Sequence, residues 1–140
     1  MLREQQGIEA EKMHKQVAVE FECAEVWIRA TQLSTDIYLE LIDCQDFDFW
    51  DQITQIGHAI ASSIAEGRAR TAFNDCADHL VSARKACREL LRQIETGQKI
   101  EHIEPSIGDQ WISETRQITA MLTALVTALL TARNNALQPA

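Results

Sequence analysis

Acidic and histidine side chains at a few positions of this sequence have the type and spacing that acid–base or metal chemistry would need. Glu11 and His14 have the Glu-x-x-His spacing of one ligand pair in a di-iron helical bundle, but such a centre needs a second pair, which the sequence lacks. Asp75 and His79 lie four residues apart and could share a metal or a hydrogen bond, while His58 stands beside small residues. Each is also explained as a surface residue or a hydrogen-bonded core residue. With no glycine-rich phosphate loop and no nucleophile elbow, the sequence predicts a non-enzymatic protein without catalytic residues, metal or cofactor.

The four cysteines, Cys23, Cys44, Cys76 and Cys87, are far apart in the sequence and form no Cys-x-x-Cys motif. A zinc or redox site normally shows closer ligand spacing. We therefore expect buried, reduced thiols that fill the core and carry no function.

Charge is distributed unevenly along the chain. The formal net charge is −8, yet residues 31–66 contain seven acids and no Lys or Arg, whereas residues 68–99 contain seven bases and four acids. Arginines at i, i+4 and i+8 beside a lysine form a cationic stripe on one predicted helix. This stripe could bind RNA or an acidic partner, or it could lie against acids of a neighbouring helix or subunit, or be a solvated face. The candidate binding residues are Arg68, Arg70, Arg84, Lys85, Arg88 and Arg92.

The elements that would position these residues are four long helices. Only five Gly and two Pro among 140 residues leave little turn chemistry, and a 46% apolar composition supports one core. Apolar residues at helical spacing predict helices over about 16–42, from Asp46 or Asp48 to Glu66, from a Thr71 cap to Gly97, and from a Ser106/Asp109 capping box onward. The economical packing is an antiparallel up-down-up-down four-helix bundle.

The bundle is predicted to span residues 16–135, between a flexible or helical extension (1–15) and a frayed tail (136–140). The first residues do not resemble a secretory signal, and the longest apolar run, residues 118–132, is shorter than the roughly 20 residues of a membrane span. We therefore expect a cytoplasmic protein that does not enter a membrane.

Residues 52–70, QITQIGHAIASSIAEGRAR, form the most informative stretch. Isoleucines recur at helical spacing, and Gly67 stands where a helix could end in a left-handed residue. Glu66 near this end opposes the helix dipole, so we expect Arg68 or Arg70 to pair with it and hold the following turn. Trp27, Trp50 and Trp111 are interpreted as core or interface anchors rather than base-stacking platforms.

These residues belong to a wider pattern, which resembles the four-helix-bundle family of proteins encoded in 23S rRNA intervening sequences. The resemblance covers about residues 21–135, and its most specific part is Ile-Ala-Glu-Gly in register with Val-Trp of the first helix. The signature residues are Val26, Trp27, Tyr38, Gln52, Ile53, Ile64, Ala65, Glu66, Gly67, Glu89 and Leu90.

The resemblance implies a four-helix protomer that assembles into a ring-shaped homopentamer, without an established catalytic set. It also implies a distant kinship with accessory proteins of diversity-generating retroelements, which bind nucleic acid and a reverse transcriptase through a basic surface. A net charge of −8 per protomer would repel phosphate backbones. Two hypotheses follow: a non-enzymatic oligomeric scaffold or adaptor, and an RNA- or ribonucleoprotein-binding accessory factor.

Overall fold

The computed structural model describes residues 2–137, and for residues 8–17 it describes the backbone alone. Within this range the chain forms four helices and no strand, which confirms the all-α prediction. The helices are α1 (Leu2–Glu40), α2 (Phe47–Arg68), α3 (Phe73–Lys99) and α4 (Pro105–Leu137). The predicted N-terminal extension is thus the helical beginning of α1, while most of the predicted frayed tail, residues 138–140, lies outside the described residues.

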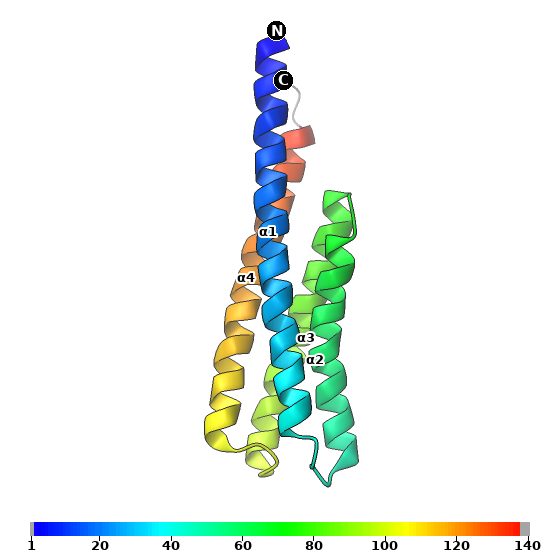
Figure 1. Ribbon diagram of the computed structural model, residues 1–140, viewed down its shortest axis with the longest axis vertical. Helices are drawn as coiled ribbons and strands as arrows, with labels where there is room; N and C mark the ends of the chain where they lie inside the picture. Colours follow the sequence, from blue (N-terminus) through cyan, green and yellow to red (C-terminus); the bar gives the residue numbers. More distant parts are fainter. Residues whose placement is uncertain (1, 138–140) are drawn as a thin grey trace.

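The four helices lie side by side along one long axis, and the chain reverses at each short connection (Figure 1). α2 packs against α1 and α3, and α4 packs against α3 and α1. At one end α1 and α4 extend well past the turn between α2 and α3 (Figure 1). That end of the bundle therefore has two helices where the rest has four.

One apolar core runs through the bundle, and all four helices contribute to it. Its periodicity follows the sequence: the buried residues of α2 recur every three or four positions, as one face of a helix requires. Burying side chains of this size contributes about 1.5–3 kcal/mol each relative to exposure. The largest fully buried side chains include Ile37, Ile53, Ile60, Ile64, Leu80, Leu90, Ile94, Ile118, Leu122 and Leu125.

The helix starts match the sequence predictions in part. Asp46 caps α2, because its side chain accepts a hydrogen bond from the Phe49 backbone N–H at 3.1 Å. Thr71 does not cap α3, whose N-cap is Ala72 with no side-chain hydrogen bond. The Ser106/Asp109 capping box is also wrong: α4 begins at Pro105, a residue favoured at the first helical position, and Asp109 accepts from Gln98 at 3.0 Å.

Both glycines predicted to stop helices lie inside them. No glycine of the described chain has a positive φ, and α2 continues past Gly67 to Arg68. A Cβ on Gly67 would lie 3.2 Å from the His79 Cβ and 3.3 Å from the Cys76 carbonyl oxygen, so glycine here permits close approach of α2 to α3. Gly97 likewise is buried within α3, and the residue with positive φ that follows this helix is Glu101, at 64°.

Candidate interaction surfaces

The histidines and acids that the sequence singled out have structural partners. His79 pairs through Nδ1 with Glu66 at 3.3 Å, joining α3 to the end of α2, rather than sharing a site with Asp75. The prediction that Arg68 or Arg70 pairs with Glu66 is therefore wrong: neither forms an ion pair with Glu66 shorter than 4.0 Å, and Arg68 lies 5.7 Å above the Trp27 ring. The side chains of Glu11 and His14 lie outside the described residues. Among the side chains that are described, no group of three or more His, Cys, Asp or Glu could hold a metal ion.

The cysteines are free, and three of the four are buried. Burial raises the pKa of the Cys87 thiol to about 11, which keeps it neutral at pH 7. Cys23 on α1 and Cys76 on α3 interact with each other, and a hydrogen bond between them, together with burial, raises the pKa of Cys23. Sequence analysis missed this pair because nothing in their spacing indicates that diagonally opposed helices bring them together.

The six basic residues predicted to bind RNA or a partner lie at three different places in the structure. Lys85, Arg88 and Arg92 lie exposed on the outer face of α3, where the acids Glu89 and Glu95 also lie exposed. None of these three cations forms an ion pair shorter than 4.0 Å with another described side chain.

The other basic candidates lie elsewhere. Arg68 and Arg70 are exposed at the α2–α3 turn. Arg84 is half-buried and donates to Thr123 of α4 at 3.4 Å, so it belongs to the seam between α3 and α4. The exposed cationic stripe on α3 is therefore shorter than predicted: it contains Lys85, Arg88 and Arg92 but not Arg84.

A second apolar face of α1 was not predicted. Phe21, Ile28 and Leu39 are 72%, 60% and 59% exposed, and their separations of seven and eleven residues place them on one face of the helix. Tyr38, one of the signature residues, is exposed here and packs against Trp50 with ring centroids 5.4 Å apart and ring planes tilted by 56°.

This face continues into a groove of about 550 Å³ between α1 and α2. Asp, Glu, Lys and Arg are absent from the groove's lining, although 24% of the chain is charged. We call the combined surface the uncharged strip. Its residues are Phe21, Ile28, Ser34, Thr35, Tyr38 and Leu39 of α1, Ile42 of the connection that follows α1, and Thr54, Gln55, His58 and Ala59 of α2.

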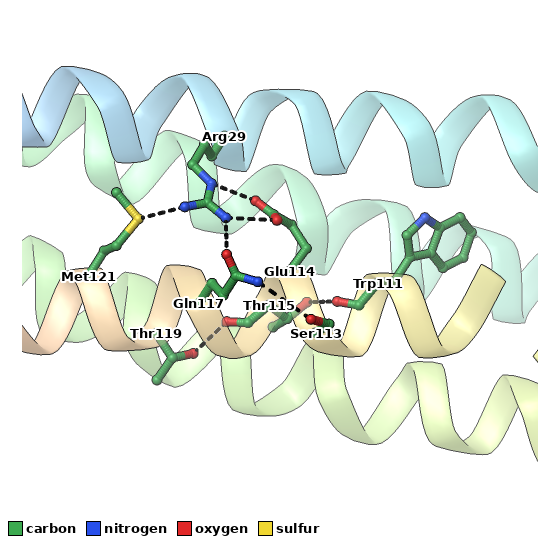
Figure 2. A network of polar contacts seen from close by, with 8 residues as sticks. All are labelled: Arg29, Trp111, Ser113, Glu114, Thr115, Gln117, Thr119 and Met121. Atoms are coloured by element: carbon green, nitrogen blue, oxygen red, sulfur yellow. Dashed lines mark hydrogen bonds and ion pairs between the residues drawn. The ribbon is translucent and has the colours of Figure 1, made fainter. Parts of the chain in front are cut away.

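A polar network on another side of α1 fixes how this helix is rotated (Figure 2). Arg29 donates to both carboxylate oxygens of Glu114 on α4, at 2.7 and 2.8 Å, and also to Gln117 at 2.6 Å and to the Met121 sulfur at 3.2 Å. The hydrogen bond with Glu114 raises the pKa of Arg29. Because successive helical residues point about 100° apart, holding Arg29 against α4 turns its neighbour Ile28 toward solvent.

The signature residues divide between core and surface. Val26, Ile53, Ile64 and Leu90 are fully buried, and Gly67 is buried at the α2–α3 contact. Exposed members include Gln52, which accepts from Gln93 at 3.4 Å, together with Tyr38, Ala65, Glu66 and Glu89. Trp27 is half-buried beneath Arg68.

Comparison with known proteins identifies a matching family and a structure with a similar fold. The model of the 23S rRNA-intervening sequence protein family matches residues 22–124. The chain is also similar to the crystal structure of a protein with unknown function from the S23 ribosomal protein family of Bacteroides thetaiotaomicron, with a TM-score of 0.63 and 19% identity over 81% of this chain and 98% of that one. At this identity the likeness concerns the fold alone. A search of curated proteins finds no match.

Proposed function

The chain belongs to the 23S rRNA-intervening sequence protein family, and we propose that it acts as a non-enzymatic, self-assembling scaffold or adaptor. The proposed protomer is the antiparallel bundle of residues 16–135, and the proposed assembly is the ring-shaped homopentamer that the family resemblance implies. The observation that carries this proposal is the uncharged strip on α1 and α2.

The strip has the properties of a surface that packs against protein. Phe21, Ile28 and Leu39 are large apolar side chains that share one exposed face of α1, and exposed apolar surface of this kind marks interaction sites. Because each protomer has a net charge of −8, a contact through uncharged residues also keeps the acids of two copies apart. A second copy of this chain therefore fits the strip.

A closed ring requires two different surfaces on each protomer, since neighbours meet head to tail. A shallow groove of about 450 Å³ on α4 provides a second surface. Its lining combines Ile112, Ser113, Gln117 and Ala120 with one acid, Asp109, and one base, Arg116. We propose that the uncharged strip of one protomer packs against this α4 groove of the next.

The structural partners of the histidines support a role without catalysis. His58, His79 and His102 contact Ser62, Glu66 and Asp46, respectively. No described helix is long and apolar enough to cross a membrane. Four free thiols favour a reducing compartment, so a cytoplasmic location belongs to the same proposal.

Sedimentation velocity at two salt concentrations tests the assembly. Ile28→Glu places a charge inside the uncharged strip and is expected to dissociate the oligomer, while Ser82→Glu adds the same charge at an exposed position of α3 and is expected to leave it intact. Higher salt is expected to tighten the wild-type assembly, because screening reduces repulsion between acidic protomers while the apolar contact persists. An oligomer that survives Ile28→Glu, or that dissociates as salt rises, argues against the uncharged strip.

A second candidate function is RNA or ribonucleoprotein binding, which the exposed Lys85, Arg88 and Arg92 favour. In this case affinity for single-stranded RNA falls with salt, with a slope of about 0.7 per phosphate contact. Charge reversal through Arg88→Glu with Arg92→Glu is expected to abolish binding, and Arg3→Glu at an exposed position of α1, outside both proposed assembly surfaces, is the matched control. Loss of the oligomer in the double variant would instead assign the stripe to an interface.

A further inference from the structure

α1 and α4 extend past the α2–α3 turn at one end of the bundle (Figure 1). A cavity of about 740 Å³ lies at this end. α2 ends at Arg68 and α3 begins at Phe73, so above this level the inner sides of α1 and α4 lose two of the helices that cover them elsewhere. The volume falls within the roughly 300–1,000 Å³ of small-molecule sites.

The floor of this cavity is apolar. Cys23 of α1, Cys76 of α3 and Leu129 of α4 line it and are buried, with exposed fractions of 2%, 8% and 4%. Val19 and Phe73 also line it and pack, half-buried, against the core. A hydrocarbon chain placed on this floor would pack against the buried side chains and exclude water from the half-buried Val19 and Phe73.

The turn side of the rim is cationic. Arg68 and Arg70 line the cavity and are exposed, and the Arg68 guanidinium lies 5.7 Å above Trp27, which keeps it beside α1. α3 starts at the same place without a side-chain cap, so the N–H groups of its first turn add partial positive charge.

The part of the rim formed by α1 carries acids. Glu20 and Glu22 line the cavity, and both are exposed. An anionic group is therefore favoured only at the turn, and the apolar part of the ligand would pack against the apolar floor. The two sides together define where a ligand's head group lies and which charge it carries.

We infer that this cavity binds a single-chain amphiphile with a carboxylate head group. The chain lies on the floor formed by Cys23, Cys76 and Leu129, and the carboxylate lies at the turn between Arg68 and Arg70. This site is separate from the uncharged strip and does not depend on assembly through it.

Titration calorimetry on the full chain with three ten-carbon probes tests the ligand class. Sodium decanoate is expected to bind with one molecule per protomer, and decyltrimethylammonium at least tenfold more weakly because its head group would meet two arginines. Decanol, which has no charge, is expected to lie between them. Equal or tighter binding of the cationic probe, or no binding of decanoate, overturns the inference.

Paired variants locate the site. Ala132→Trp fills the cavity from α4 and is expected to weaken decanoate binding at least tenfold, whereas Ala124→Trp adds the same side chain at an exposed position of α4 outside the lining. Replacing both Arg68 and Arg70 with Ala is expected to weaken decanoate binding three- to tenfold without affecting decanol. Equal affinities of the two tryptophan variants contradict the proposed location.

The native thiols provide a readout that needs no substitution. Cys76 lines the cavity, and Cys44 lies in the connection between α1 and α2 at the other end of the bundle. Saturating decanoate is expected to slow alkylation of Cys76 by iodoacetamide at least fivefold, measured by mass spectrometry, and to leave Cys44 unchanged. No slowing at Cys76, or equal slowing at both thiols, overturns the inference.

Discussion

Replacing Gly97 with alanine separates two roles of glycine in this fold. If Gly97 were an ordinary helical glycine, alanine would stabilise α3 by about 0.8–1 kcal/mol through helix propensity. In the structure a Cβ at this position would lie 2.5 Å from the Ile103 Cδ1 and 2.6 Å from the Phe49 Cζ, and both side chains are buried. Overpacking of this kind costs about 1–3 kcal/mol. We therefore expect a net destabilisation of about 1 kcal/mol, or roughly 3 °C in Tm for a chain of this length.

Gly57→Ala is the matched control for this substitution. Gly57 is also helical and buried, but a Cβ there would make ordinary contact, 3.5 Å from the Ser34 Oγ, so alanine is expected to stabilise by up to about 1 kcal/mol. Urea denaturation followed by circular dichroism measures both changes. Ile103→Val removes one of the clashing methyl groups and is expected to cost less in the Gly97→Ala background than alone. A Gly97→Ala variant as stable as Gly57→Ala would refute the close-contact explanation.

Three further predictions concern the helix contacts. The bidentate pair of Arg29 with Glu114, with side chains 31% and 32% exposed, is expected to show a coupling of about 1 kcal/mol in a double-mutant cycle with alanine; a value near zero would make it a surface pair of no consequence. Glu101→Gly removes a left-handed non-glycine residue and is expected to stabilise by about 1 kcal/mol in urea denaturation; an unchanged or lower stability would contradict backbone strain at this position. Hydrogen bonds from Phe49 and then His102 lower the pKa of Asp46 below its ordinary 3.8, so its stabilisation is present above pH 3.8 and is lost as pH falls through the lowered value. Thermal melts of the wild type and Asp46→Asn should therefore differ near neutral pH and converge toward pH 2.

The helices and the core were predictable from the sequence because their signal is local. The isoleucines of α2 repeat at helical spacing, and Ile53, Ile60 and Ile64 are buried as that spacing indicates. Asp46 was predictable as a cap for the same reason, since a cap acts within three residues of its own chain. The role of Gly67 was not predictable from the sequence. Glycine is favoured both where a helix ends and where a neighbouring helix packs closely, and only the position of α3 shows that Gly67 has the second role.

The interaction surfaces depend on information that the sequence does not carry locally. α1 has two apolar faces, and spacing alone does not show that Tyr38 lies on the outer one. The partner of Arg29 lies 85 residues away on α4, so local spacing does not show which side of α1 faces α4. The cavity at the open end likewise arises from where α2 ends relative to α1 and α4.

Size-exclusion chromatography with light scattering tests the central claim most directly. The wild-type chain is expected to elute with about five times the 15.8 kDa protomer mass, and a variant with Ile28→Glu and Leu39→Glu is expected to elute as a folded protomer. Circular dichroism of the eluted variant verifies that the bundle is intact. A wild-type monomer, or a double variant that keeps the mass of the oligomer, would contradict assembly through the uncharged strip.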